Sequence, residues 1–378
     1  MSEVTSLPAN FVQWLKNKNE NDYWYASDVP QDFAIKKFHY YSKALKEKSL
    51  QCKQVTWFIT NKCDLSCVHC GVSANERAFS ELTLEQFITF IPKLKKIGVE
   101  YITLSGGEPL VRKDAPEIIS TLKKYGFKLG MVTNGSKVKK LCQNMTEYKL
   151  DSISISIDGM EKNHSLIRKS KSNFQKAIES IKTAKEAGVK IVAVSTCVYP
   201  HNIEDLELLK ETIFSNGADQ WILRPITPSG RAFEKSDYFM NHHQIKNLLY
   251  FATLNLLKGY DVTVGADLGY LGKLDSSLYS APYFCSVGWN SMIILPNGDI
   301  KGFDEAHLPY EGNLLTDDLE EIWFNGFKYY REPNLPETCY QCEYFISCRG
   351  GYIPGAEMGR RCLKPVLKMF EEDAQKTV

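Results

Sequence analysis

The run Cys63-Asp64-Leu65-Ser66-Cys67-Val68-His69-Cys70 brings three thiols together in the spacing C-x3-C-x2-C. It follows Gln54-Val-Thr-Trp-Phe-Ile-Thr60, an apolar and β-branched run that is typical of a buried strand. Thiolates are the ligands of iron–sulfur clusters, and three of them leave one iron of a 4Fe–4S cube open for chemistry. A zinc site is the alternative, but it needs a fourth ligand, and His69 is squeezed between two cysteines. The spacing therefore favours a catalytic cluster.

A second motif, Ser105-Gly106-Gly107-Glu108-Pro109, follows another strand-like run, Glu100-Tyr-Ile-Thr-Leu104. Two glycines let the backbone come close to a ligand, and a carboxylate beside them can receive an ammonium group. A tight turn between a strand and a helix would use the same residues, so this motif alone does not decide between binding and structure.

Together, in this order and each after a strand, the two motifs resemble those of the radical S-adenosylmethionine (SAM) superfamily. The resemblance implies that Cys63, Cys67 and Cys70 hold a 4Fe–4S cluster whose fourth iron chelates the amino and carboxylate groups of SAM. It also implies that His69, at a position that is usually aromatic, packs near the adenine. SAM would then be cleaved reductively to methionine and a 5′-deoxyadenosyl radical. The residues implied to orient the methionine are Ser105, Gly106, Gly107 and Glu108.

Strand and helix patterns alternate from Cys52 to Lys258, which predicts an α/β fold of six βα units with a parallel sheet and helices outside. The resemblance makes this a partial (βα)6 TIM-type barrel, with functional groups at the carboxyl ends of the strands. The expected strands are 54–60, 100–105, 127–133, 151–157, 189–197 and 219–224. The expected helices are 83–96, 114–124, 136–146, 173–187, 203–215 and 241–257.

Polar residues at the ends of later strands are further candidates. By resemblance, Ser156 and Asp158 lie where relatives contact the ribose of SAM. Arg168, in the stretch His164-Ser-Leu-Ile-Arg168, would approach the SAM carboxylate, which suits a planar fork of donors. An Asp-Gly turn and a solvent-facing arginine are the structural alternatives. Arg224 and Arg231, after the sixth strand, can face SAM or substrate, or pin loops.

The carboxyl-terminal region carries a second group of cysteines that resembles the SPASM extension of radical SAM peptide maturases. The full pattern of that extension supplies ligands for two auxiliary clusters. One set is broken here, because Phe303 and Tyr352 stand where cysteines are expected beside Cys285. The sequence thus predicts one auxiliary 4Fe–4S cluster, with a zinc ribbon as the alternative. The complete set consists of Cys339, Cys342, Cys348 and Cys362.

These patterns divide the chain into four parts. Residues 1–51 form a short helical segment, with helix-like stretches at Asn10–Lys18 and Gln31–Lys46, that either caps the next domain or binds peptide. Residues 52–258 form the barrel, and residues 259–282, where Gly, Asp and Ser recur, form a linker. Residues 283–378 form the SPASM-like module, with a hairpin around Asn297-Gly298 and a short helix at Asp317–Asn325.

Length and composition limit the classes of protein to which the chain can belong. The chain of 378 residues is 43% hydrophobic and has a formal net charge of +1, so it can bury a large core and has no dedicated nucleic-acid surface. An apolar run long enough for a membrane span and a signal peptide are both missing from the sequence as given, which predicts a cytoplasmic protein. Its 11 cysteines cluster in a way that favours metal ligation.

The resemblance implies a radical SAM oxidoreductase that acts on a ribosomally synthesised peptide by C–H abstraction, leading to a cross-link, a cycle or an oxidation. A flavodoxin- or ferredoxin-type protein would supply electrons. A small-molecule substrate, such as a sugar or a tetrapyrrole side chain, is the first alternative. An iron–sulfur electron-transfer or binding protein is the second, although such a protein needs no Gly-Gly-Glu turn.

Two leftover thiols are catalytic candidates. Cys197 lies at the end of the fifth strand, and Cys285 has lost its presumed co-ligands. A thiol near a substrate radical can donate a hydrogen atom and so epimerise a peptide. Packing is the alternative, because free cysteines are among the most buried residues.

Overall fold

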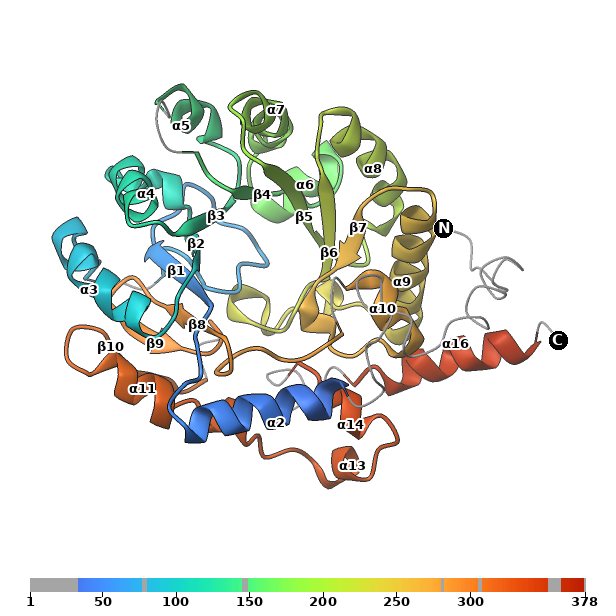
Figure 1. Ribbon diagram of the computed structural model, residues 1–378. Helices are drawn as coiled ribbons and strands as arrows, with labels where there is room; N and C mark the ends of the chain where they lie inside the picture. Colours follow the sequence, from blue (N-terminus) through green and yellow to red (C-terminus); the bar gives the residue numbers. More distant parts are fainter. Residues whose placement is uncertain are drawn as a thin grey trace.

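The computed structural model describes residues 33–76, 80–144, 149–279, 282–304, 308–352 and 362–376. Within these ranges ten strands form one sheet, in the order β10-β9-β8-β1-β2-β3-β4-β5-β6-β7. Figure 1 shows that the sheet is curved and that most helices line its outer side. The shape is that of an incomplete barrel, as the resemblance implied.

The six predicted βα units are confirmed. All of their strands run parallel. The strands are β1 (Gln54–Thr60), β2 (Tyr101–Gly106), β3 (Lys128–Thr133), β4 (Ser152–Ser156), β5 (Ile191–Val198) and β6 (Gln220–Pro225). The helices after them are α3 (Leu84–Lys96), α4 (Ala115–Lys124), α5 (Val138–Asn144), α7 (Asn173–Glu186), α8 (Leu206–Ser215) and α9 (His242–Leu257). An additional short helix, α6 (Glu161–Arg168), precedes α7.

Alternation along the strands separates the two faces of the barrel wall. In β4, Ile153 and Ile155 are buried, whereas the serines between them are partly exposed. In β6, Trp221 and Leu223 are buried and the residues between them are partly exposed. Since side chains alternate in direction along a strand, the buried set packs under the helices and the partly exposed set faces the inside. The inner face therefore presents polar side chains, among them Ser154, Ser156 and Arg224, together with apolar ones such as Ile222.

The segment 259–282, expected to be a linker, is packed structure. It contributes β7 (Val262–Val264), which pairs in parallel with β6, and α10 (Asp275–Leu278), whose four residues are all buried. The Asp275 carboxylate accepts hydrogen bonds from the backbone N–H groups of Leu271 and Tyr283. Of the Gly, Asp and Ser residues that suggested a linker, Asp275, Ser276 and Ser277 thus lie in buried α10, while Gly269 adopts a positive φ at the end of a single helical turn.

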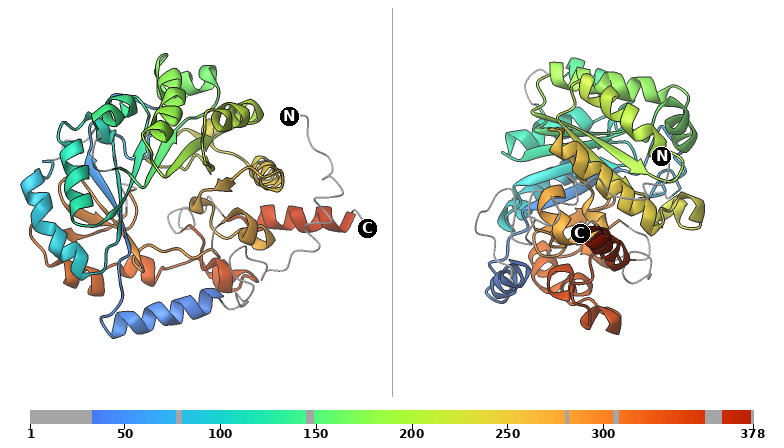
Figure 2. Two further views of the ribbon diagram at one scale, coloured as in Figure 1. Left: turned by 45° about the horizontal axis from the view of Figure 1, so that its top comes forward. Right: turned by 90° about the vertical axis from the view of Figure 1, so that its right-hand side faces the viewer.

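The carboxyl-terminal module continues the same sheet. β8 (Ser291–Ile294) pairs in parallel with β1, β9 (Asp299–Lys301) forms the predicted hairpin with β8, and β10 (Tyr310–Asn313) adds the edge. The predicted helix is α11 (Leu319–Asn325). The last helix packs against α9 and crosses it, since in the left-hand view of Figure 2 it lies lengthwise while α9 is seen nearly end-on. The remaining helices are α12 (Lys328–Arg331), α13 (Glu337–Tyr340), α14 (Phe345–Cys348) and α16 (Lys364–Lys376).

Helix α2 (Phe33–Lys46) rests on this module. Phe38 lies edge-on to Trp289, with ring centroids 5.5 Å apart, and the Arg349 guanidinium lies 3.8 Å from the Phe38 ring centre. Tyr41 stacks on the same Trp289. The expected helix at Asn10–Lys18 lies outside the described residues. In the described part of the chain, no helix combines the length and apolar character that a membrane crossing requires.

Candidate active site

The loop after β1 carries Cys63, Cys67 and Cys70. Asn75 shapes this loop, because its side chain accepts from the Cys63 N–H and donates to the Cys63 carbonyl, both at 2.9 Å. The Leu65 N–H donates to Cys63 Sγ at 3.4 Å. Burial raises the pKa of the Cys63 thiol to about 12, and binding to a metal ion would have to offset this cost for the thiolate to form. These features fit metal ligation.

The spacing of the sulfur atoms separates a cluster from a single zinc ion. Among the described residues, the group whose potential ligand atoms all lie within 4.8 Å of one another is His69, Asp158 and Cys197, and no group of three or more cysteines is that tight. A tetrahedral zinc with Zn–S bonds of about 2.3 Å would bring its sulfur ligands to about 3.8 Å from one another. The wider spacing suits a 4Fe–4S cube, whose ligands bind separate irons.

Two other segments hold the cysteine loop in place. After β6, the Arg231 Nε donates to the Cys67 carbonyl at 2.7 Å, and a Cβ on Gly230 would lie 2.2 Å from the Cys70 carbonyl oxygen. At the end of α6, the Ile167 carbonyl accepts from the Val68 N–H at 2.7 Å. Of the roles considered for Arg231, the geometry supports pinning a loop.

The Gly-Gly-Glu turn lies against the start of the cysteine loop. A Cβ on Gly106, whose φ is +138°, would lie 2.1 Å from the Thr60 carbonyl oxygen. A Cβ on Gly107 would lie 2.2 Å from the Lys62 carbonyl oxygen. Both glycines are therefore required for the close approach of two backbones, and this approach sets the turn beside Cys63.

Glu108 is fully buried and its carboxylate is occupied by the protein. It accepts from the Thr133 hydroxyl at 2.8 Å, the Asn134 N–H at 2.7 Å and the Leu110 N–H at 3.1 Å. Burial raises its pKa to about 7. The sequence suggested that this carboxylate receives an ammonium group, but its oxygens point to the end of β3 and brace the turn. The backbone of the turn is left to face a ligand.

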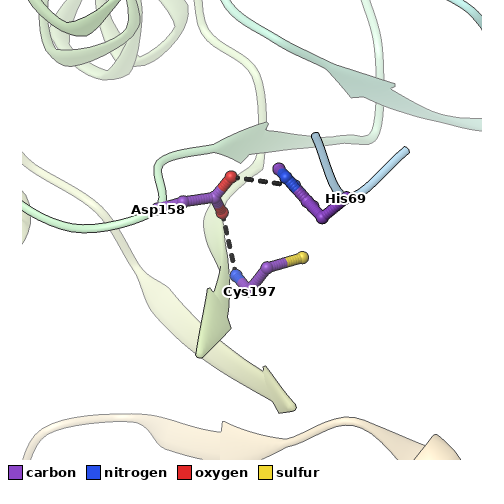
Figure 3. A group of neighbouring side chains, drawn as sticks. All are labelled: His69, Asp158 and Cys197. Atoms are coloured by element: carbon purple, nitrogen blue, oxygen red, sulfur yellow. Dashed lines mark hydrogen bonds and ion pairs between the residues drawn. The ribbon is translucent and has the colours of Figure 1, made fainter. Parts of the chain in front are cut away.

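Asp158 joins three candidate residues from different elements. Its Oδ2 lies 2.7 Å from Arg168 Nε and 3.1 Å from His69 Nε2, and its Oδ1 accepts from the Cys197 N–H at 2.8 Å. Figure 3 shows this arrangement, with the Cys197 sulfur pointing away from the carboxylate. Burial alone would favour the neutral acid, but Arg168 and His69 hold the pKa of Asp158 far below its ordinary range. Asp158 is thus an ionised anchor.

His164 ties this anchor to the cysteine loop. Its Nδ1 accepts from the Asp158 N–H, and its Nε2 lies 2.9 Å from the Asn173 side-chain oxygen. Burial lowers the pKa of His164 to about 4, so the ring is neutral and its Nε2 carries the proton. Asn173 donates in turn to the Asn134 carbonyl, and Asn134 donates to Asp64 beside Cys63. The network fixes the relative positions of β3, β4 and the loop.

The remaining barrel candidates share the inner face. Ser105 and Ser156 are partly exposed there, and Cys197 lies opposite Arg224 in the register of β5 and β6. Burial raises the pKa of the Cys197 thiol far above its ordinary value, so its S–H bond is retained. His69 Nδ1 is buried and has no hydrogen-bond partner in the described structure. A buried ring nitrogen without a protein partner at this position fits a bound cofactor.

The auxiliary cysteines converge on one cavity of about 350 Å³. Apolar side chains such as Leu268, Tyr270 and Leu367 complete its wall. The cysteines that line it are Cys339, Cys342, Cys348 and Cys362. This is the complete set expected from the sequence, and it fits a second cluster.

The broken ligand set is replaced by aromatic packing. The rings of Phe303 and Tyr352 meet edge to face with centroids 5.1 Å apart, and Phe303 also packs on Tyr330. Cys285 shares a narrow cavity with Cys348, and burial raises its pKa to about 11. The structure therefore separates the two leftover thiols: Cys197 lies at the barrel mouth and Cys285 in the auxiliary module.

Sequence reasoning missed the residues that shape the cysteine loop. Asn75 adopts a positive φ of 71°, and Asn134 connects the loop to β3. Asparagine tolerates the left-handed region, so an asparagine five residues after the last cysteine was the available signal for a turn. The role of Asn134 had no local signal, because it depends on how β3 meets the loop.

The chain matches two families of known proteins. Residues 57–213 match the radical SAM superfamily, and residues 285–343 match the SPASM iron–sulfur cluster-binding domain. It is 28% identical over 304 residues to the mycofactocin maturase MftC of Mycobacterium ulcerans, covering 79% of this chain and 82% of the relative. It is 25% identical over 315 residues to the AdoMet-dependent heme synthase of Methanosarcina barkeri, covering 78% and 90%.

Solved structures show the same fold. Streptococcus suis SuiB bound to its precursor peptide SuiA has a TM-score of 0.65 at 17% identity, covering 83% of this chain and 75% of that one. Native anSMEcpe with bound AdoMet and the Kp18Cys peptide has a TM-score of 0.65 at 17% identity, covering 85% and 96%. At such identities the likeness concerns the fold alone.

A partial barrel with a three-cysteine loop at its mouth and a four-cysteine cavity in an appended module defines an iron–sulfur enzyme. The chain belongs to the radical SAM superfamily and carries a carboxyl-terminal SPASM domain. The alternative of an electron-transfer protein without SAM chemistry is therefore wrong.

Proposed function

We propose that this enzyme modifies a ribosomally synthesised peptide oxidatively, by C–H abstraction followed by formation of a cross-link, a cycle or an unsaturated bond. The observation that carries the proposal is the four-cysteine cavity, because an oxidation must remove a second electron after the hydrogen atom has left. A cluster held by Cys339, Cys342, Cys348 and Cys362 can receive that electron. Peptide maturation in the name of MftC and the precursor peptide bound to SuiB support the substrate class.

In this proposal the barrel residues bind and orient. When bound, the cluster and SAM supply one-electron cleavage to a 5′-deoxyadenosyl radical. Cys63, Cys67 and Cys70 ligate the core cluster, and the backbone of Gly106 and Gly107 faces the methionine amino group. Ser105 lies on the inner face just before this turn. Glu108 supports the turn from behind through its bonds to the end of β3.

Arg168 is proposed to bind the SAM carboxylate. Its Nε is held by Asp158, which fixes the guanidinium plane and leaves the terminal nitrogens unused by that bond. The guanidinium is close enough to the Cys67 thiol for the two to interact electrostatically, as a ligand chelated to the cluster would require. His69 would lie against the adenosyl group, and Ser156 at the ribose. Asp158, whose oxygens are all engaged, acts through Arg168 and His69 rather than on the ribose itself.

Product mass tests the proposal. The reconstituted enzyme would be reduced anaerobically with SAM and the peptides encoded by short reading frames beside its gene. We expect 5′-deoxyadenosine together with a peptide product lighter by about two mass units, since two hydrogens leave and the auxiliary cluster accepts an electron. A Cys342→Ala variant is expected to cleave SAM without forming product. Formation of 5′-deoxyadenosine with no change in any peptide would contradict the substrate class.

Two specific observations favour alternative functions, and the same assay distinguishes them from the proposed one. Cys197 keeps its S–H bond on the inner face, as a hydrogen donor in an epimerase must. A product of unchanged mass that carries one solvent deuterium, and is lost in Cys197→Ala, would establish that role. The match to the heme synthase covers 90% of that relative. Turnover of a tetrapyrrole carboxylate side chain in place of any peptide would establish a small-molecule substrate.

A further inference from the structure

Helix α6 lies at the outer edge of the cluster loop and begins with the exposed Glu161. From Lys162 to Ile178 the chain then carries five lysine or arginine residues and no aspartate or glutamate. Arg168 is buried against Asp158, whereas the lysines are exposed, and no ion pair within the described structure involves them. An exposed cation without a partner is free to meet an anion from another molecule. The exposed lysines are Lys162, Lys169, Lys171 and Lys176.

Apolar side chains are exposed beside these lysines. Leu166 on α6 is 63% exposed, and Phe233, just after β6, is 44% exposed. Their neighbours Ile167 and Ala232 belong to one small buried cluster, against which Val68 of the cysteine loop packs. The buried neighbours of Leu166 and Phe233 therefore pack beside the same stretch of the loop. Next to Phe233, Glu234 and Lys235 are both exposed and balance in charge.

The position of this surface relative to the core cluster is fixed by backbone contacts. The Val68 N–H donates to the Ile167 carbonyl at 2.7 Å, and the Arg231 N–H donates to the Cys70 carbonyl at 3.0 Å. Both segments thus touch residues adjacent to, or part of, the ligand set. A protein seated on Leu166 and Phe233 would therefore lie beside segments that touch the core cysteine loop directly.

We propose that Lys162, Leu166, Lys169, Lys171 and Phe233, here named the α6 patch, bind an acidic one-electron carrier of the flavodoxin or ferredoxin type. The proposal rests on the radical SAM reaction, which consumes one electron at the core cluster for each SAM cleaved. In the step concerned, the reduced carrier loses one electron and the cluster gains it, and no bond is made or broken. An apolar centre with a basic rim suits a small, transient contact with an acidic partner.

The helix geometry explains how three of these residues act together. Lys162 and Leu166 are spaced four residues apart, so they lie on one face of α6, and Lys169 follows at the end of the helix. The lysines steer an acidic carrier during encounter, an effect that salt weakens, while Leu166 supplies apolar contact after encounter. Lys169 ends the helix in the left-handed conformation, which turns the chain toward Lys171.

The test compares two reductants for SAM cleavage without a second substrate. Reduced flavodoxin, or reduced ferredoxin in a parallel series, must dock, whereas dithionite is a small molecule that need not. In Leu166→Glu and in the double variant Lys162→Glu/Lys169→Glu, we expect the KM for the protein carrier to rise by about tenfold or more, with a weaker dependence on salt. The rate with dithionite should stay unchanged in both variants.

Matched controls lie at the other end of the barrel. Leu257 is 51% exposed and Lys258 is exposed, and both end α9 just before β7, on the side where the strands begin. Leu257→Glu and Lys258→Glu should leave both reductants unaffected. If neither protein carrier reduces the wild-type enzyme, or if the α6 variants accept carrier electrons as the wild type does, the proposal is wrong.

Two further outcomes distinguish a failure of the α6 patch proposal from a failure of the proposed peptide substrate. An equal loss with dithionite and with carrier would mean that the substitutions disturb the active site, which also overturns the proposal. If instead carrier-driven cleavage is normal but peptide turnover with dithionite falls, the α6 patch binds peptide and not a redox protein. Because the assay needs no peptide, a wrong substrate class would leave its result intact.

Discussion

Two buried carboxylates in the site show how neighbours decide the state of an acid. Asp158 faces Arg168 and His69 and is held ionised. Glu108 receives three hydrogen bonds, but all come from uncharged donors, and burial raises its pKa to about 7. A neighbouring positive charge offsets the desolvation of a buried carboxylate more fully than uncharged hydrogen-bond donors do. Asp158 is therefore suited to hold cations in place, and Glu108 to brace a turn.

Replacing Glu108 by Gln should lower the free energy of unfolding by about 1–3 kcal/mol, because the Asn134 N–H loses its carboxylate acceptor. The difference in unfolding free energy between the wild type and Glu108→Gln should depend on pH. In the wild type the folded pKa of about 7 exceeds the ordinary value of 4.5, so the stabilising protonated form is fully present below pH 4.5 and is lost as the pH rises to 7. Glutamine does not titrate.

The gap between wild type and Glu108→Gln should therefore narrow by about 1 kcal/mol between roughly pH 6 and pH 8. Anaerobic urea unfolding at the two pH values measures it. Glu117→Gln, on the exposed side of α4, serves as the control and should show no such change. A gap that widens with pH would mean that Glu108 is ionised in the folded protein.

At the scale of elements, sequence periodicity predicted the repeated βα units and missed the short elements that lie outside them. The six βα units follow from alternating apolar runs, and all six strands lie where they were expected. Helix α6 and strand β7 were missed, since each is short and its polar residues resemble a loop. The segment 259–282, expected to be a linker, likewise contains packed structure, because the buried Asp275 carboxylate accepts hydrogen bonds from backbone donors that composition cannot reveal.

The parts of the site that are formed by contiguous residues could be predicted from the sequence, and the parts that join distant segments could not. The cysteine ligands and the Gly-Gly turn are visible in the sequence, because each motif is contiguous. The meeting of His69, Arg168 and Cys197 on Asp158 depends on a loop, a helix and a strand that the sheet brings together. Roles for Asp158 and Glu108 were expected toward SAM, and the structure directs both carboxylates toward the protein.

Helix α2 is not part of a βα unit, and the contacts that dock it on the carboxyl-terminal module can be tested by mutation. Phe38 packs between Trp289 and Arg349, whereas Tyr40, two residues on, is 69% exposed. Phe38→Ala should cost about 1–3 kcal/mol, less than a fully buried phenylalanine, and should release α2. Faster trypsin cleavage after Lys43 and Lys46, and faster amide exchange in α2, would report this. Tyr40→Ala should change neither, and equal effects from both would show that α2 is not docked through Phe38.

At the scale of the whole molecule, barrel and auxiliary module share one sheet. β8 pairs with β1, the strand that leads into the core cysteine loop, and α16 packs against α9 with an ion pair between Lys246 and Asp373. Their connection through β7 and α10 is buried. The two cluster sites are thus parts of a continuous structure, and loss of one cluster need not separate the module from the barrel.

Iron content follows from this arrangement. Three core cysteines and four cavity cysteines provide for two cubes, while the rings of Phe303, Tyr330 and Tyr352 fill the place of a third set. The anaerobically reconstituted protein should hold about eight irons and eight sulfides. Cys67→Ala and Cys342→Ala should each retain about four, and only the second should still cleave SAM, because its loss is remote from the SAM site. Circular dichroism must show that both variants are folded. About twelve irons in the wild type would mean that Cys285 ligates a cluster despite its aromatic neighbours, and about four would leave the cavity without one.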